Sequence, residues 1–268
     1  MDASPPPSLG PRPWREGLLD FIATRPHLHL FLDFDGTLTP IAVHPDDAHL
    51  SQEARDVLAL VLARAATRVV LTSGRHLAGL VKKVDDPALD LIGNHGLEWR
   101  VDGLRGEDPA VARVAPAMTA IGTQLQPRVA ATAGAVLEQK GGSLSLHLRG
   151  AEPSAAASLA SLLDRLVLEH PEVITHPGRG LIEVRPRVGP NKGTAIERLL
   201  VAAHGTDWDR DCAAVFLGDD RTDEDGFAVL GERGAGVRVL GGEGPTLARY
   251  CAASVGDVLS LLAAIGGR

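Results

Sequence analysis

Short apolar runs alternate with amphipathic segments along most of the chain. Residues 28–34 are mostly apolar, as in a strand buried on both faces, and residues 51–65 carry apolar side chains at helical spacing after Ser51, a suitable N-cap. Strands that alternate with helices in this way predict a parallel sheet with helices on both faces. The same pattern predicts strands at 68–71, 89–92, 213–217 and 237–240, and helices at 76–84, 194–204, 224–230 and 258–265.

The middle of the chain has a different pattern. Residues 143–148 alternate apolar with polar side chains, which is typical of a strand with one face in solvent. Residues 173–176 and 181–184 flank Pro177-Gly178-Arg179-Gly180, which predicts a hairpin, and 154–170 has a helical pattern. These features predict an antiparallel sheet with helices on one face.

The change of pattern predicts an α/β fold with an insertion. We expect a Rossmann-like, parallel-sheet core formed by residues 14–105 and 188–268, and an inserted α+β domain formed by residues 106–187. Residues 1–13 are rich in proline and lack the apolar segment of a signal peptide, so we expect them to form a disordered tail.

Composition and charge narrow the class of protein. The chain has 268 residues, a net charge of −7, 3% aromatic residues and no long run of Lys or Arg, which disfavours a nucleic-acid partner. No apolar run approaches the roughly 18 residues of a membrane span, so no membrane partner is expected. Cys212 and Cys251 lack metal-ligand spacing in the sequence, and we expect buried thiols in a reducing cytoplasm.

Polar residues gather where the predicted parallel strands end. Asp33 and Asp35 close the first strand, and Ser73, Gly74 and Arg75 follow the second. Ligands of parallel sheets bind beyond the carboxyl ends of the strands, so these residues should share one rim. The same rim should receive Lys192, at the start of a predicted helix, and the acids Asp219 and Asp223 after a later strand.

Each of these features has a structural explanation when taken alone. An Asp-Gly pair after a strand is often a turn, and Ser73 would serve equally as a helix cap. Acids such as Asp219 and Asp223 suit the start of a helix, whereas Lys192 is unfavourable there without a nearby anion. Acids and a lysine that converge on one rim from distant parts of the sequence favour a functional site instead.

Phosphoryl transfer through a covalent intermediate needs this set of residues. A carboxylate attacks a phosphate dianion poorly because both are negative, and a hard cation held by oxygen ligands, such as Mg²⁺, removes the repulsion. We expect Asp33 to attack phosphorus, and Asp35 to protonate the leaving oxygen and later activate water. The other expected roles are metal binding by Asp219 and Asp223 together with Asp33 and Asp35, and phosphoryl binding by Ser73 and Lys192.

Four short motifs resemble those of the haloacid dehalogenase (HAD)-type phosphatases. They are Asp33-Phe34-Asp35-Gly36-Thr37, Leu71-Thr72-Ser73-Gly74-Arg75, Lys192-Gly193 and Gly218-Asp219-Asp220. Their order and spacing fit that superfamily. The resemblance implies a Mg²⁺-dependent phosphatase whose inserted segment is a C2-type cap.

Longer motifs resemble, more closely, the trehalose-6-phosphate phosphatase family. They span residues 93–98, 138–149, 183–186 and 218–225, within a similarity that runs from about residue 28 to 262. The resemblance implies trehalose 6-phosphate as substrate, in trehalose biosynthesis. It also implies that substrate is bound by Gly74, Arg75, His95, Glu138, Lys140 and Glu183, with Arg149 as an additional contact. His76, Asn191 and Leu148 depart from the family pattern without touching a catalytic position.

Other functions stay open on the sequence alone. A sibling phosphatase for another sugar phosphate, such as sucrose 6-phosphate, would differ only in its cap residues, and Glu138 and Lys140 would equally suit a solvated strand edge. A phospho-receiver signalling module also needs an acceptor aspartate, but it needs neither Asp35 nor an insertion of roughly eighty residues. We expect a monomer that binds a small sugar phosphate, with association to a trehalose-6-phosphate synthase left open.

Overall fold

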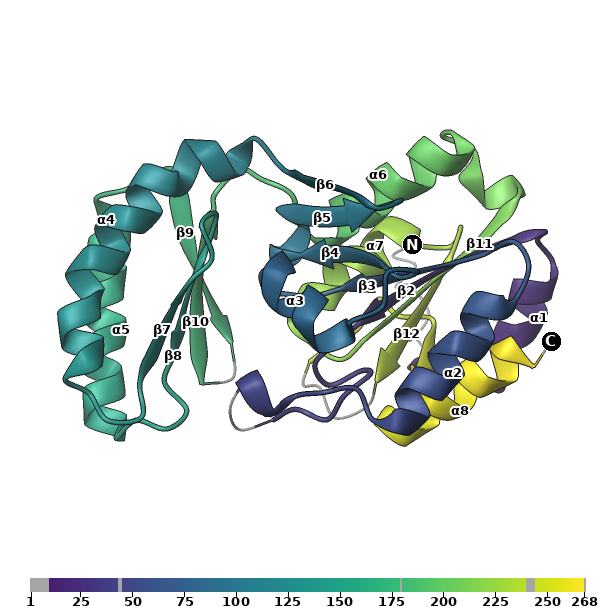
Figure 1. Ribbon diagram of the computed structural model, residues 1–268, viewed down its shortest axis with the longest axis horizontal. Coiled ribbons are helices and arrows are strands. Elements are labelled where there is room, and N and C mark those ends of the chain that lie inside the picture. The colour runs from purple at the N-terminus through teal and green to yellow at the C-terminus, as the bar shows by residue number, and fades with distance from the viewer. Residues whose placement is uncertain (1–9, 43–44, 179, 240–243, 268) are drawn as a thin grey trace, which may run out of the picture.

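The computed structural model describes residues 10–42, 45–178, 180–239 and 244–267. Two sheets organise the chain (Figure 1). Within the described residues, the larger sheet has nine strands in the order β1 (Arg12–Pro13), β13 (Tyr250–Ala252), β12 (Ala235–Val239), β11 (Cys212–Gly218), β2 (His27–Asp33), β3 (Thr67–Thr72), β4 (Asp90–Gly93), β5 (Glu98–Val101) and β6 (Leu104–Glu107). The smaller sheet has four, in the order β7 (Val136–Gln139), β8 (Leu144–His147), β10 (Leu181–Pro186) and β9 (Val173–Gly178).

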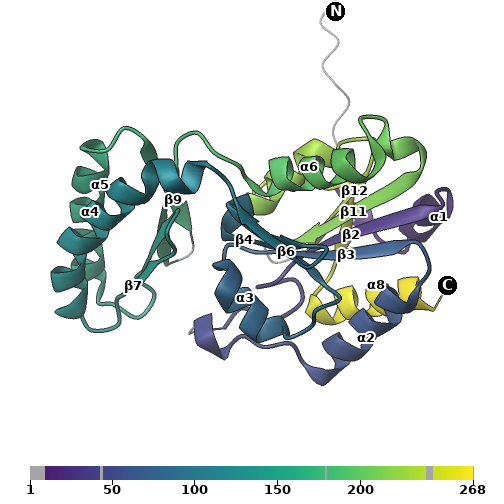
Figure 2. The same cartoon turned by 45° about the horizontal axis from the view of Figure 1, so that its top comes forward.

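The larger sheet is parallel from β1 to β4, and only the β5–β6 hairpin at one edge is antiparallel. Helices cover both of its faces, as Figure 2 shows. On one face lie α6 (Lys192–His204) and α7 (Glu224–Leu230), and on the other α1 (Leu18–Ala23), α2 (Gln52–Ala63), α3 (Leu77–Val84) and α8 (Val255–Gly266). The predicted α/β core is therefore confirmed.

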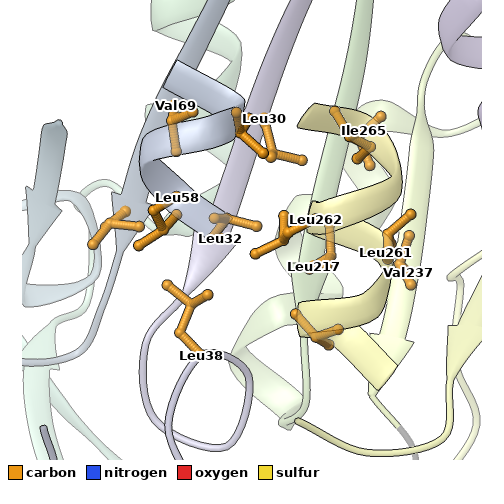
Figure 3. Close-up of a cluster of buried hydrophobic side chains, with 14 of the residues drawn as sticks. Leu30, Leu32, Leu38, Leu58, Val69, Leu217, Val237, Leu261, Leu262 and Ile265 are labelled. Carbon is orange, nitrogen blue, oxygen red and sulfur yellow. The ribbon is translucent and has the colours of Figure 1, made fainter. Parts of the chain in front are cut away.

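The central strands are buried on both faces, which explains their apolar runs. Leu30 and Leu32 of β2 pack with Leu58 of α2 and Leu262 of α8 (Figure 3), whereas Phe31 packs on the α6 side. Burying one such leucine stabilises the fold by about 1.5–3 kcal/mol. This core fixes the strands firmly, and it ends where the first polar residues of the rim begin.

The smaller sheet is antiparallel and is covered on one face only. Helices α4 (Ala110–Ala130) and α5 (Pro153–Leu168) lie on the face that points away from the larger sheet (Figure 1). Leu144, Leu146 and Val184 pack with these helices. Because side chains alternate along a strand, the intervening residues face the larger sheet. They include a row of directly paired residues across four strands: Glu138, Ser145, Glu183 and His176.

The prediction of a disordered tail at residues 1–13 is wrong for its last two residues. Arg12 and Pro13 form the short edge strand β1, parallel to β13, and Arg12 donates a hydrogen bond of 2.8 Å to the hydroxyl of Tyr250. An edge strand tolerates proline because one side needs no hydrogen-bond donor. Residues 1–9 of the predicted tail, and Leu240 of the predicted strand 237–240, lie outside the described residues.

The expected start of the insertion at residue 106 falls within a strand of the larger sheet. Asp102 and Gly103 have φ of 51° and 75°, as in a two-residue hairpin turn, and they join β5 to β6, which runs to Glu107. The chain passes to the smaller sheet only after this hairpin. Among the described residues, no helix is both long and apolar enough to span a membrane.

Candidate active site

Asp33 is the last residue of β2, at the centre of the larger sheet. It pairs in register with Thr72, the last residue of the neighbouring strand β3, and Ser73 follows directly. On its other side, β11 ends at Gly218, one residue before Asp219. The carboxyl ends of three adjacent strands thus place Asp33, Ser73 and Asp219 at one rim, as predicted. The smaller sheet lies beyond this rim (Figure 1).

The acids of the rim form a buried cluster with one lysine. Carboxylate oxygens of Asp33, Asp219 and Asp223 lie within 4.8 Å of one another. Lys192 Nζ, at the first turn of α6, donates to Oδ1 of Asp33 and to Oδ1 of Asp223, each at 2.6 Å. The backbone amides of Asp219 and Asp220 donate to Oδ2 of Asp223 at 2.9 and 3.0 Å. We call Asp33, Lys192, Asp219 and Asp223 the acid cluster.

Negative charge outweighs positive charge in the acid cluster. Burial and the neighbouring aspartates raise the pKa of Asp33 well above its usual range, although Lys192 opposes the shift. Burial likewise raises the pKa of Asp223 to about 7. Burial alone would lower the pKa of Lys192, but Asp223 and Asp33 outweigh it and raise that pKa. An all-oxygen donor set short of positive charge fits a hard divalent cation.

Two glycines have no side chain, and the acids occupy the space where one would lie. Gly36 has φ of +89°, and a Cβ there would lie 2.3 Å from Oδ2 of Asp219. A Cβ on Gly218 would lie 2.2 Å from Cγ of Asp223. Any side chain at either position would therefore displace an acid, and at Gly36 it would also impose a strained backbone.

Asp35 and Arg75 form a bidentate ion pair. Nε and Nη2 of Arg75 donate to Oδ2 and Oδ1 of Asp35, each at 2.7 Å. Arg75, expected to bind substrate, is thus directed at the second aspartate of the motif. Both carboxylate oxygens of Asp35 are engaged, so Asp35 could exchange a proton only after this ion pair opened.

The turn after β3 contacts the inserted segment. Ser73 Oγ accepts from the backbone N–H of Arg75 at 3.1 Å, and the Gly74 carbonyl accepts from Lys140 Nζ at 2.8 Å. A Cβ on Gly74 would lie 2.5 Å from Nε2 of His95. Ser73 is therefore held inside the turn, and Gly74 and His95 meet residues of the smaller sheet.

Glu183 of β10 lies at the centre of a second polar group, between the two sheets. Its carboxylate is 3.1 Å from Nε2 of His95, 3.3 Å from Oγ of Ser145 and 3.5 Å from Nζ of Lys140, and it pairs with Arg185. Burial alone would raise the pKa of Glu183, but these contacts hold it well below its usual range. Burial, opposed by Glu183 and aided by Arg185, lowers the pKa of His95 to about 4. We call these five residues the Glu183 cluster.

The other two residues expected to bind sugar lie at different distances from the Glu183 cluster. Glu138 adjoins it, with Oε2 3.7 Å from Lys140 Nζ and 3.3 Å from Nε2 of His147. Arg149 instead donates to the carbonyl of Ala42 at 3.0 Å, on a loop of the core. The structure thus groups Glu138, Lys140 and Glu183, and places Arg149 against that loop.

Several residues of the site were not predicted individually. Arg185 was detectable, because it stands two residues after Glu183 and so shares its face of the strand. Asn94 is fully buried with φ of 50°; it donates to the carbonyl of Lys140 at 3.2 Å and accepts from Ser143 Oγ. Asp220 accepts from Thr222, and its pKa is about 2 because Lys192 and Thr222 outweigh the effect of burial. Contacts of Asn94 that span 46 and 49 residues leave no local signal.

Comparison with curated proteins gives relatives of one kind. The chain is 31% identical over 223 residues to trehalose-phosphate phosphatase B of Arabidopsis thaliana, covering 79% of this chain and 58% of the relative. It is 32% identical over 225 residues to trehalose-phosphate phosphatase of Mycobacterium bovis, covering 83% and 56%. The chain thus spans little more than half the length of these relatives.

Known structures and a family model agree with these relatives. A structure of the C-terminal domain of trehalose-6-phosphate phosphatase from C. albicans superposes with a TM-score of 0.83 over 96% of this chain and 99% of that one; at 24% identity the likeness concerns the fold. The family model described as trehalose-phosphatase matches residues 31–253, which include both polar clusters. The chain belongs to the trehalose-phosphatase family.

Proposed function

We propose that the chain hydrolyses trehalose 6-phosphate to trehalose and phosphate through a phosphorylated aspartate. The position of Asp33 carries the proposal: it ends the central strand, 2.6 Å from Lys192 and within 4.8 Å of the ligand atoms of Asp219 and Asp223. The family membership supports trehalose 6-phosphate over sucrose 6-phosphate as the substrate.

In this mechanism one carboxylate oxygen of Asp33 attacks phosphorus, and the bond from phosphorus to the sugar oxygen breaks. Asp35, released from Arg75, gives a proton to the leaving oxygen. Asp35 then takes a proton from water, whose oxygen attacks the phosphorylated Asp33, so that phosphate leaves and the Asp33 carboxylate is restored. Lys192 and Ser73, helped by the first turn of α6, hold the phosphoryl oxygens.

The acid cluster would hold a Mg²⁺ ion through Asp33, Asp219 and Asp223, with a further oxygen ligand from Asp35. When bound, the ion would offset the charge of the carboxylates and of the phosphate. The support is the excess of buried acids over Lys192, with the raised pKa of Asp33 that accompanies it. Arg75, which is paired with Asp35 at the rim, would turn from Asp35 to the phosphoryl group.

Substrate recognition is proposed for the inserted segment, acting as a cap over the rim. Glu138, Lys140 and Glu183 share the face that points to the core, and Lys140 already contacts Gly74 next to the acid cluster. Sugar hydroxyls would replace part of these contacts, and charge-assisted hydrogen bonds to the hydroxyls would select the sugar. Arg149 remains a proposed outer contact.

Phosphate release over a panel of sugar phosphates tests the proposal. Trehalose 6-phosphate should be turned over fastest, sucrose 6-phosphate and glucose 6-phosphate much more slowly, and a chelator should stop all three reactions. A preference for sucrose 6-phosphate would reject the substrate and keep the phosphatase. A stable label from acetyl phosphate without turnover would instead indicate a phospho-receiver.

The setting of the enzyme is also a proposal. The two buried cysteines, Cys212 and Cys251, are free thiols, which supports the reducing cytoplasm. A monomer and a complex with a trehalose-6-phosphate synthase stay predictions, which sizing chromatography of the chain with and without the synthase would test.

A further inference from the structure

A second group of ligating side chains lies at the opposite end of the larger sheet. His29 and Cys212 belong to the neighbouring strands β2 and β11, near their amino ends, and His204 is the last residue of α6. The side chains of His29 and Cys212 lie on the α6 side of the sheet, with Phe31 and Ala214. The fold thus brings together three side chains that are far apart in sequence and belong to no part of the phosphatase site.

The geometry of this group resembles that of a metal site. Nε2 of His29 and Nε2 of His204 share a hydrogen bond of 3.1 Å, which a metal bound between the rings would replace. One ligand atom each from His29, His204 and Cys212 lie within 4.8 Å of one another. Two nitrogens bound to one tetrahedral zinc ion, each about 2.0–2.1 Å from it, lie roughly 3.3 Å apart. The two imidazoles are therefore already spaced as zinc ligands.

One polar atom of this buried group is left without a hydrogen bond among the described residues. His29 is 6% exposed, and its Nδ1 has no hydrogen-bond partner within the part of the chain that the structure describes. A neutral imidazole has one ring nitrogen with a lone pair, which is the form that binds a metal. The positive charge of Arg68, which acts on His29, is paired with Asp90 and Asp102.

An entry path is present beside the group. A surface pocket of about 480 Å³ is lined by His27, His29 and Arg68, among other residues, and His204 is itself partly exposed. An ion could therefore reach His29 through this pocket and His204 from its own exposed side. With three protein ligands, a fourth coordination position would be left for water.

We propose that His29, His204 and Cys212 bind a borderline divalent transition-metal ion, such as Zn²⁺, at the end of the core opposite the acid cluster. Nitrogen and thiolate donors select such an ion over Mg²⁺, which prefers oxygen. Binding replaces the thiol proton of Cys212, which is released to solvent, by the metal–sulfur bond. The protein thus has two sites of orthogonal donor chemistry.

The bound ion would tie the end of α6 to the sheet. This helix begins with Lys192 in the acid cluster and ends with His204, a span of roughly 18 Å at 1.5 Å per residue. Cross-linking its last residue to β2 and β11 would stabilise the folded chain by mass action, without contacting the substrate.

Cobalt spectroscopy of the full chain tests the proposal. Co²⁺ is added in excess Mg²⁺, which occupies the acid cluster. We expect one equivalent of Co²⁺ to give a near-ultraviolet thiolate charge-transfer band and the intense visible bands of four-coordinate Co²⁺, and Zn²⁺ to abolish both. Cys212→Ser should lose the charge-transfer band, and His204→Gln should weaken binding at least tenfold. The matched controls Cys251→Ser and His170→Gln, which change a thiol and an imidazole elsewhere, should bind like the wild type.

A thermal measurement tests metal binding without Cys212→Ser, in case that variant does not fold. Zn²⁺ in excess Mg²⁺ should raise the Tm of the wild type and of Cys251→Ser but not that of His204→Gln, each compared with its own metal-free Tm. If the wild type shows no more than the weak spectrum of six-coordinate Co²⁺, the proposal is overturned. A charge-transfer band that survives in Cys212→Ser, or an equal gain in Tm for His204→Gln, would overturn it as well.

Discussion

The acid cluster and the Glu183 cluster hold buried carboxylates in opposite electrostatic situations. Asp33 shares a single lysine with two other acids, and its pKa is raised. Glu183 is surrounded by Lys140, Arg185 and the ring of His95, and its pKa is lowered. Both carboxylates are deeply buried, so burial alone does not separate them.

The difference indicates how each cluster would respond to a ligand. The acid cluster has three acids and one lysine, so an added cation should stabilise it. The Glu183 cluster has its charges satisfied within the protein. A sugar bound there would have to displace existing contacts, and it would gain only the difference between old and new hydrogen bonds. The first cluster should therefore govern whether chemistry occurs, and the second should govern which substrate is selected.

Asp33→Asn should have the largest effect on this comparison. Turnover of trehalose 6-phosphate should fall by at least about a thousandfold, or about 4 kcal/mol, because the amide is no nucleophile. Unfolding should show an unchanged or raised Tm, since the change removes one buried negative charge. Retention of a tenth or more of the wild-type rate would reject the covalent mechanism.

Glu183→Gln should have a smaller effect that depends on the substrate. We expect a loss of about 10- to 100-fold in kcat/KM for trehalose 6-phosphate, or about 1.4–2.7 kcal/mol, and little change for p-nitrophenyl phosphate, which has no sugar to recognise. Lys140→Ala should behave alike, and Glu172→Gln, an exposed glutamate of the cap, serves as control. Equal losses on both substrates would assign Glu183 to the fold or to the chemistry.

The pKa of Asp223 predicts a pH dependence of stability in chelator. The folded chain holds this proton more tightly than the unfolded chain, since its pKa is about 7 instead of 3.8. Stability should therefore fall as pH rises between these two values, with the full penalty present above about pH 7. We expect at least about 1 kcal/mol between about pH 5 and pH 8, measured by denaturant unfolding.

Two controls sharpen this measurement. Asp223→Asn should remove its share of the pH dependence, and saturating Mg²⁺ should reduce it in the wild type by offsetting the acids. An unchanged slope in Asp223→Asn would show that the charge imbalance lies elsewhere.

Asn191→Ala should have the smallest effect. Asn191 caps α6 by accepting from the backbone of Thr194 at 2.8 Å, and the Thr194 side chain accepts from the Asn191 N–H at 2.9 Å. Loss of the cap should cost about 0.5–1 kcal/mol of unfolding free energy and leave the chemistry in place, because Lys192 keeps its two acids. Denaturant unfolding and phosphate release measure the two effects separately, and a hundredfold loss of rate would mean that the cap positions Lys192.

The sequence allowed the strands of the core and their rim to be predicted, because apolar runs that end in acids are local signals. Helix α4 was missed, since Pro116 and Pro127 interrupt its sequence although both are accommodated within the helix. The β5–β6 hairpin was missed despite its Asp102-Gly103 turn.

The contacts of individual site residues were harder to predict than their positions. The pairing of Asp35 with Arg75 joins residues 40 apart, and that of His95 with Glu183 joins residues 88 apart. Such pairs depend on how two sheets and a turn pack together, and the pattern of apolar and polar residues along the sequence does not show this. The group of His29, His204 and Cys212 could not be predicted for the same reason: the three residues are far apart in the sequence, and only the packing of the fold brings them together.

Gly36 shows that a residue without any functional group can be as strictly required as an acid. Its hydrogen atom occupies the place where a methyl group would meet Asp219 at 2.3 Å. An alanine there would push Asp219 aside while every charged side chain of the acid cluster stayed in the sequence. The space beside Asp219 therefore belongs to the candidate site as much as the acids do.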